Sequence, residues 1–293
     1  MDSQRDRVVV CDWDGFFSDA EQEGGPFVAA YLADLAKLTG FDEQEVARLA
    51  VEFEARIAAE PDKHGWLSHR VIVAPARVDP YMRMMAVARL MFDRVGRFMD
   101  PQDREVVLNF LYESHYKKTK IVFRPGAREA FLALWAYGRD TLYVVTNSAA
   151  DAVCDKICAL VGPLEGLEEW LSAHVVGGAK KYDPDEVAGQ EVSWSVPAVL
   201  ELPGLNRPVQ LHRPRYFRTL DAIRQRHSAR FEDLVVGGDI FEMDLALPLT
   251  LGARVALLAS ERTPAYELPF LAQHPRGRVL TYIREFPAFA MGE

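Results

Sequence analysis

The chain has 293 residues, of which 49% are hydrophobic and 26% charged, and its formal net charge at pH 7 is −9. This composition is typical of a globular protein, and the length suits one large domain or two ordinary ones. The acidic balance argues against a nucleic-acid partner, because phosphates require a basic surface. No membrane partner is expected either, because charges interrupt the apolar runs well before the roughly 18 residues that a span needs.

Three cysteines and the N-terminal sequence MDSQRDRVVV bear on the cellular compartment. So few cysteines give no disulfide framework and suit a reducing environment. The N-terminal sequence lacks a long apolar signal region with a cleavage site. We therefore expect a cytoplasmic protein, whose oligomeric state the sequence leaves unknown.

Short apolar runs rich in β-branched residues predict strands that are buried on both faces, as in a parallel sheet. Five such runs occur, at residues 8–11, 141–145, 234–237, 254–259 and 278–283. Helical patterns lie between most of them. Strands that alternate with helices predict a doubly wound, Rossmann-like α/β core with a parallel sheet.

Two segments interrupt this alternation. Residues 21–120 carry helical periodicity and few strand signals, which predicts an inserted, mainly helical domain. Its last apolar stripe consists of Val106, Val107, Phe110 and Leu111. Residues 175–211 contain Gly, Pro and short apolar runs, which predict a small hairpin or irregular lobe within a core of residues 1–20 and 121–293.

Acidic residues follow the first predicted strand in the sequence VVVCDWDG. Ligands of doubly wound sheets bind outside the carboxyl ends of the strands, and alternation along the chain points Asp12 and Asp14 to the same side. Such a pair suits a hard cation such as Mg²⁺, or a nucleophile beside a general acid. A turn or helix cap rich in aspartate is the alternative for these two residues.

Two further predicted strands end in polar residues. The sequence LVVGGDIFEMD brings Asp239 and Asp244 to the end of one strand, and Thr146-Asn147-Ser148 follows another. A hydroxyl and free backbone N–H groups at a strand-to-helix turn are suited to holding a phosphate oxygen. The three strand ends together offer the parts that a metal-assisted phosphoryl transfer needs.

These sequences resemble the motifs of the haloacid dehalogenase superfamily, phosphatase type. Its first motif, an apolar strand and Asp-x-Asp-Gly, reads VVVCDWDG here, and its second, a strand ending in Thr or Ser, reads LYVVTNS. Its fourth, Gly-Asp-x-x-x-x-Asp, reads GGDIFEMD, and FRPGAREAFLALWAYG resembles the helix before its second motif. The resemblance covers the core and not the inserted segments.

The resemblance implies a role for each matching residue. Asp12 would be the nucleophile that forms an aspartyl-phosphate, and Asp14 the general acid and then the base. Thr146 and the N–H of Asn147 would hold phosphoryl oxygens. The implied Mg²⁺ ligands are Asp12, the backbone carbonyl of Asp14, Asp239 and Asp244, of which the last would ligate or orient.

The third motif, a lysine that is often followed by proline, matches less well. Arg213 stands at the lysine position of HRPRYFRTLDAI, at close to the family's usual distance from Asp239. Lys180 and Lys181 in GGAKKYDP are the rivals. Any of these cations would neutralise the nucleophile and the phosphoryl group, arginine with a planar fork and lysine with a point charge. We favour Arg213, with Lys181 as a further candidate for binding substrate.

The helical insert lies where the family carries a mobile cap over the active site, which implies a small phosphorylated substrate. Asp14 argues against the dehalogenase and phosphonate-cleaving branches, because both lack this aspartate. We therefore predict a Mg²⁺-dependent phosphomonoester hydrolase. A phosphomutase keeps the same residues, and a non-catalytic binding or scaffold protein fits the missing third-motif lysine, so both alternatives stay open.

Overall fold

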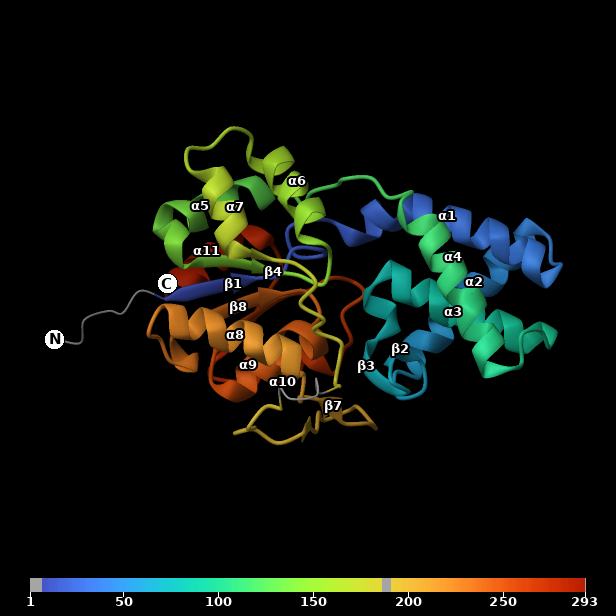
Figure 1. Cartoon of the computed structure of the whole chain (residues 1–293). Helices are drawn as coiled ribbons and strands as arrows, with labels where there is room; N and C mark the ends of the chain where they lie inside the picture. Colours follow the sequence, from blue (N-terminus) through green and yellow to red (C-terminus); the bar gives the residue numbers. More distant parts are fainter. Residues whose placement is uncertain (1–6, 186–190, 293) are drawn as a thin grey trace. The chain divides into compact units, whose positions relative to one another are not determined.

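The computed structural model describes residues 7–185 and 191–292, and the chain divides into two compact units. The first unit consists of Met1–Asp19, Ser68–Val73 and Phe123–Glu293, and the second of Ala20–Leu67 and Ala74–Val122. Figure 1 shows a sheet with helices in the first unit and a group of helices in the second. Among the described residues, no helix is both long and apolar enough to cross a membrane.

A parallel sheet of six strands, in the order β10-β9-β8-β1-β4-β5, forms the centre of the first unit. Its strands are β1 (Val8–Cys11), β4 (Leu142–Val145), β5 (Val175–Val176), β8 (Leu234–Gly238), β9 (Arg254–Leu258) and β10 (Gly277–Leu280). All five predicted strands are present. Cys11 of β1 pairs with Val144 on one side and Gly237 on the other, so three strands end at the same level.

The sixth strand, β5, corrects the expected boundary of the second insertion. Val175 and Val176 were expected to begin a small hairpin or irregular lobe, but they pair with Val144 and Val145 of β4. Two residues are too few to produce a recognisable strand pattern. The predicted small hairpin is confirmed, because β6 (Val199–Leu200) and β7 (Val209–Gln210) pair in antiparallel fashion.

Helices cover both faces of the sheet. The helices α5 (Ala127–Gly138), α6 (Ala150–Val161), α7 (Leu167–His174) and α11 (Phe286–Met291) pack on one face, and α8 (Pro214–Arg226), α9 (Ala246–Leu251) and α10 (Glu267–Gln273) on the other (Figure 1). Alternate residues of β1 enter the two cores, Val9 and Cys11 on one side and Val8 and Val10 on the other. This pattern of burial on both faces explains why β1 is apolar throughout.

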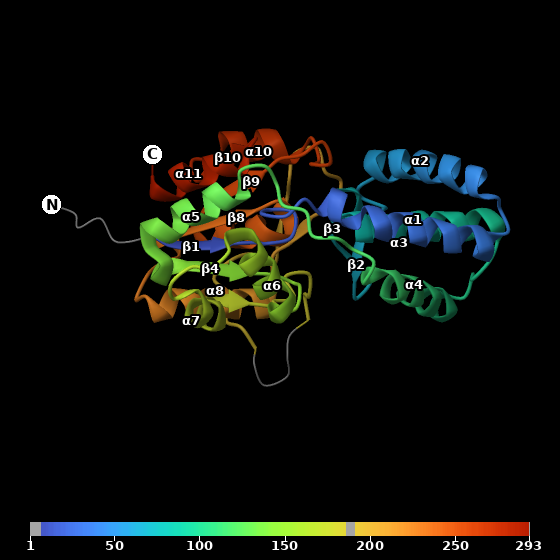
Figure 2. The same ribbon diagram turned by 90° about the horizontal axis from the view of Figure 1, so that it is seen from above.

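The second unit is built mainly from four helices. They are α1 (Ala20–Thr39), α2 (Glu43–Ala59), α3 (Pro80–Val95) and α4 (Pro101–Tyr116). A separate two-stranded sheet of β2 (Gly65–Ser68) and β3 (Val71–Pro75) is divided between the units, because Ser68–Val73 is assigned to the first. In Figure 2, α1 and α3 lie side by side between α2 and α4. The mainly helical prediction for this segment is confirmed, although the β2–β3 sheet was not expected.

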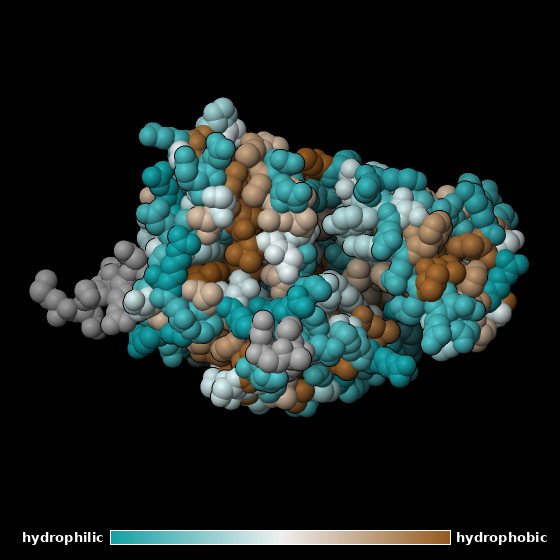
Figure 3. Space-filling model, in the orientation of Figure 1, coloured by the Kyte–Doolittle hydropathy of each residue, from teal (hydrophilic) through white to brown (hydrophobic). Residues whose placement is uncertain are grey.

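The buried face of α4 differs from the predicted stripe. Leu108, Leu111 and His115 are buried, whereas Val106 and Phe110 are 69% and 64% exposed. His115 can be buried because its Nε2 lies 2.8 Å from Oδ2 of Asp34. The buried face of α4 therefore includes a polar residue and does not coincide with the predicted apolar stripe. Figure 3 accordingly shows apolar groups among hydrophilic ones on the visible surface of this unit.

Candidate active site

The first aspartate pair lies in a tight turn after β1. The N–H groups of Phe16 and Phe17 donate to the carbonyl of Trp13, at 3.2 and 3.0 Å. Gly15 has a φ of +84°, and a Cβ at this position would lie 2.0 Å from Oδ2 of Asp239. Glycine therefore suits both the left-handed backbone conformation and the close approach of the Asp239 carboxylate.

Three carboxylates meet beside this turn. One oxygen each of Asp12, Asp239 and Asp244 lie within 4.8 Å of one another. The backbone N–H of Asp12 donates to the carbonyl of Gly237 at 2.8 Å, which joins the ends of β1 and β8. Asp244 is fixed by the N–H of Ile240, which donates to its Oδ2 at 3.0 Å. The structure thus brings together the acidic residues from two strand ends.

Lys181 is the cation that lies among these carboxylates. Its Nζ is 2.6 Å from Oδ1 of Asp12 and 2.9 Å from Oδ1 of Asp244, and its side chain is 1% exposed. Its backbone N–H donates to Oδ1 of Asn147 at 2.8 Å. Burial opposes the charge of Lys181, but Asp12 and Asp244 outweigh burial and hold its pKa above the usual value.

Asp12 has an unusual electrostatic environment. Burial raises the pKa of Asp12 to about 7, and Lys181 opposes this effect. The neighbouring carboxylates of Asp244 and Asp14 act in the same direction as burial and contribute to this raised pKa. Additional positive charge at this site would favour the ionised form, in which a carboxylate can act as a nucleophile.

Arg213, which the sequence favoured as the third-motif cation, binds elsewhere. Its buried guanidinium donates to the backbone carbonyls of Lys181 at 2.5 Å, Val73 at 2.7 Å and Gln210 at 3.1 Å. Burial lowers the pKa of Arg213 to about 10. The structure therefore places Lys181, and not Arg213, beside Asp12, while Arg213 supports the backbone that carries the lysine. Lys180 precedes this lysine in a left-handed conformation, with a φ of 46°.

Hydrogen-bond donors from the loop after β4 and from α6 surround the carboxylate of Asp14. The hydroxyls of Ser148 and Thr146 lie 2.6 and 3.4 Å from its Oδ2, and Nζ of Lys156 lies 2.8 Å from its Oδ1. Thr146 is positioned by its N–H, which donates to the carbonyl of Val176 at 2.9 Å. Sequence reasoning missed Lys156, because it is on α6, outside any motif, and only helix packing brings it to Asp14.

A buried ion pair connects the second insertion to the loop that bears Asp239 and Asp244. Arg207 donates to both carboxylate oxygens of Glu242, at 2.7 and 2.9 Å. The hydroxyl of Tyr266 donates to the same carboxylate at 2.8 Å. Since Glu242 lies between the two aspartates in sequence, this contact holds the loop in place from its outer side.

No protein-family model matches the sequence, and no curated protein matches it. Among solved structures, a protein described as a predicted phosphoglycolate phosphatase from Haemophilus somnus is 13% identical, with a TM-score of 0.54. That alignment covers 98% of this chain and 99% of the other. A conserved haloacid dehalogenase-like protein of unknown function from Agrobacterium tumefaciens is 14% identical with a TM-score of 0.51, over 97% and 98% of the two chains. The chain has the haloacid dehalogenase fold.

Within this haloacid dehalogenase fold, the donor set at the carboxyl ends of the strands fits a hard divalent cation. The cluster of Asp12, Asp239 and Asp244 offers only oxygen ligands, which Mg²⁺ prefers. The close approach of Gly15 to Asp239 leaves no room for a side chain at this point. These observations are compatible with a magnesium site of the kind that the motifs imply.

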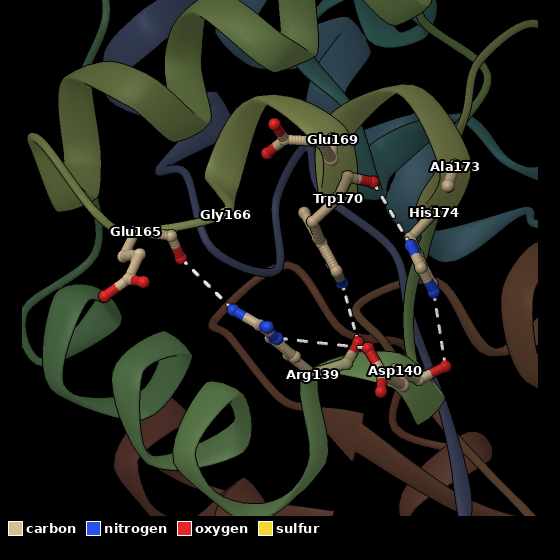
Figure 4. Close-up of a pocket in the computed structure, with 8 residues that line it drawn as sticks. All are labelled: Arg139, Asp140, Glu165, Gly166, Glu169, Trp170, Ala173 and His174. Atoms are coloured by element: carbon tan, nitrogen blue, oxygen red, sulfur yellow. Dashed lines mark hydrogen bonds and ion pairs between the residues drawn. The ribbon is translucent and has the colours of Figure 1, made fainter.

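A separate pocket lies away from these carboxylates. It is lined by residues before β4 and on α7, including Arg139, Asp140, Trp170 and His174 (Figure 4). Asp140 precedes β4 and Thr146 follows it, so this pocket is at the opposite end of the strand from the candidate site. It supplies none of the predicted catalytic residues.

Proposed function

We propose that the protein is a Mg²⁺-dependent phosphomonoester hydrolase that acts on a small phosphorylated metabolite through an aspartyl-phosphate on Asp12. The observation that carries this proposal is the environment of Asp12. Its carboxylate lies 2.6 Å from the buried ammonium of Lys181 and within 4.8 Å of two further carboxylates. A buried carboxylate with a fixed cation and a metal-binding cluster at its side is suited to attack a phosphoryl group.

Asp12 would attack phosphorus while the bond to the leaving oxygen breaks. Lys181, the hydroxyls of Thr146 and Ser148, and the N–H of Asn147 would hold the phosphoryl oxygens in fixed positions. When bound by Asp12, the backbone carbonyl of Asp14, Asp239 and Asp244, Mg²⁺ would supply further positive charge to the transferring group.

Asp14 would serve both halves of the reaction. It would first donate a proton to the leaving oxygen of the substrate. It would then accept a proton from the water that attacks phosphorus and releases phosphate from Asp12. Both functions require its carboxylate beside the phosphoryl group. Its contacts with the hydroxyls of Thr146 and Ser148, which we propose to hold phosphoryl oxygens, support this.

We also propose that the helical segment, residues 21–120 in our sequence division, acts as a cap. It is inserted between the strand that carries Asp12 and the one that precedes Thr146. A cap excludes water and favours small substrates over phosphoproteins. The identity of the metabolite would then depend on side chains of this segment.

Phosphate release from a panel of small phosphomonoesters, with and without Mg²⁺, tests the proposed function. We expect turnover that requires Mg²⁺ and that Asp12→Asn reduces by at least about 10³-fold, because an amide is no nucleophile here. Asp140→Asn is a matched control, since its side chain is 90% exposed at the other end of β4. Equal turnover by native protein and Asp12→Asn would refute the proposal.

A further inference from the structure

Lys156 contacts the proposed acid–base residue from outside the sequence motifs. Its Nζ donates to Oδ1 of Asp14 at 2.8 Å. The side chains of Lys156 and Asp14 are 21% and 31% exposed, so the contact lies at the edge of the buried site. Lys156 is therefore a charged neighbour of a residue on which the proposed chemistry depends.

The two oxygens of Asp14 have different partners. Oδ2 accepts from the hydroxyls of Ser148 at 2.6 Å and Thr146 at 3.4 Å, which are the groups proposed to hold the phosphoryl oxygens. Oδ1 accepts from Lys156. Oδ2 thus faces the position of the phosphoryl group, and Oδ1 faces α6.

The helix that carries Lys156 is a rigid support. Val153, Ile157 and Leu160 of α6 are buried in the core on one face of the sheet. Lys156 precedes Ile157 directly, so the base of its side chain is fixed by that packing. An ammonium presented from such a helix restricts the rotation of the Asp14 carboxylate.

We propose that Lys156 is a positioning residue that holds Oδ1 of Asp14, so that Oδ2 transfers the proton. This inference rests on the proposed function. In the first half of the reaction, Oδ2–H gives its proton to the leaving oxygen as the P–O bond to that oxygen breaks and the bond from Asp12 to phosphorus forms. In the second half, Oδ2 takes a proton from the attacking water, whose oxygen bonds to phosphorus as the bond between the Asp12 oxygen and phosphorus breaks, and phosphate leaves.

The contact should matter more for the rate than for stability. Ion pairs that are partly exposed contribute little to folding stability. A small displacement of a reacting group can lower a rate about 10²-fold. Substitution of Lys156 should therefore leave the fold intact and impair proton transfer selectively.

Two substrates with different leaving groups separate proton transfer from phosphoryl binding. An alkyl phosphate needs protonation of its leaving oxygen, whereas the p-nitrophenolate of p-nitrophenyl phosphate leaves without it. We expect Lys156→Met to lower kcat on the alkyl phosphate. This loss should be about 10- to 100-fold larger than the loss in the single-turnover rate constant for formation of p-nitrophenolate. Lys156→Arg, which keeps a cation, should recover part of the difference.

A comparison variant and a binding measurement complete the test. Ser148→Ala should raise KM for both substrates and weaken the binding of inorganic phosphate, because Ser148 contacts the phosphoryl position. Lys156→Met should leave the dissociation constant of inorganic phosphate within about threefold of native, because the phosphoryl group keeps its other donors. Lys37→Met, at a side chain that is 76% exposed on α1, controls for loss of charge.

Equal losses on both substrates together with weaker phosphate binding would overturn the inference, because Lys156 would then hold the phosphoryl group itself. Native rates for Lys156→Met on both substrates would overturn it as well. Failure of the native protein to turn over either substrate would instead refute the proposed function. The two claims therefore fail in different ways.

Discussion

Lys181 lies between two buried carboxylates, and its removal would leave both without their common cation. Nζ contacts Asp12 and Asp244 at 2.6 and 2.9 Å, and each of these side chains is at most 8% exposed. The carboxylates of Asp12 and Asp244, with oxygens within 4.8 Å of each other, would repel strongly in a poorly solvated site. The lysine is therefore expected to serve stability as well as catalysis.

We predict that Lys181→Met lowers the proposed phosphatase activity by about 10²- to 10³-fold, because a fixed charge beside the proposed phosphoryl position is lost. It should also lower the free energy of unfolding by about 3 kcal/mol, because two buried carboxylates lose their cation. Activity assays and urea unfolding without Mg²⁺ check the two parts. Lys180→Met is the adjacent control, and a loss of activity there equal to that of Lys181→Met would contradict the assignment.

The residues that sequence analysis identified at the site share one property: they follow strands of recognisable length. Asp12, Thr146 and Asp239 each come directly after a buried strand of four or five residues. Lys181 follows β5, which has only two residues and was not recognised as a strand, whereas Arg213 was preferred for its place in HRPRYFRTLDAI and its distance from Asp239. The position of Lys156 depends on how α6 packs, which residue spacing along the chain does not encode.

At the scale of elements, the Arg207–Glu242 pair connects the second insertion to the loop that bears Asp239 and Asp244. Both side chains are at most 10% exposed, and both carboxylate oxygens accept from the guanidinium. Removing one member of a buried pair leaves the other charge unsolvated, which costs about 3–5 kcal/mol. The pair should therefore show strong energetic coupling.

A double-mutant cycle with Arg207→Met and Glu242→Gln measures this coupling. We predict that each single substitution destabilises the first unit by about 3 kcal/mol, and that the double variant loses at least about 2 kcal/mol less than the sum. The amide that replaces the carboxylate keeps an oxygen that can accept from Tyr266. In a Trp66→Phe background, tryptophan fluorescence in urea reports the first unit, because the remaining four tryptophans lie there. Additive effects would show that the two side chains act independently.

Elements with a clear pattern of apolar residues in the sequence were predicted correctly, and elements with an ambiguous apolar pattern were not. The five longer strands of the sheet appear as expected because burial on both faces makes them continuously apolar. The prediction of the buried face of α4 was wrong, because the apolar residues of this helix lie on more than one side and His115, paired with Asp34, is buried. Pairing across 81 positions of sequence cannot be read from local periodicity.

At the scale of the whole molecule, pH should act on stability through histidines remote from the candidate site. Burial lowers the pKa of both His174 and His227. His174 lies between the carbonyls of Trp170 and Asp140, as Figure 4 shows, and Nε2 of His227 lies 2.8 Å from the hydroxyl of Tyr143. Both are therefore expected to be neutral in the folded protein at neutral pH.

The sign of the pH effect follows from these directions. Below about pH 6.5 the unfolded chain binds protons at both histidines while the folded chain does not, so stability falls as the pH decreases. We predict that His174→Gln with His227→Gln flattens the loss between pH 7 and pH 5, by at most about 1.4 kcal/mol per pH unit for each proton. Urea unfolding at several pH values measures this slope. His69→Gln, at a side chain that is 53% exposed, is the control, and a double variant with the native slope would disprove the prediction.

The most direct test of the account is whether a phosphoryl group becomes covalently bound to Asp12. In Asp14→Asn, p-nitrophenolate can still leave from p-nitrophenyl phosphate, but water is not activated, so the aspartyl-phosphate should accumulate. We predict that acid quenching with Mg²⁺ present, followed by peptide mass spectrometry, finds one phosphoryl group on Asp12 and none in Asp12→Asn/Asp14→Asn. Release of p-nitrophenolate with no phosphoryl group on Asp12, or with the group on another residue, would contradict the proposed mechanism.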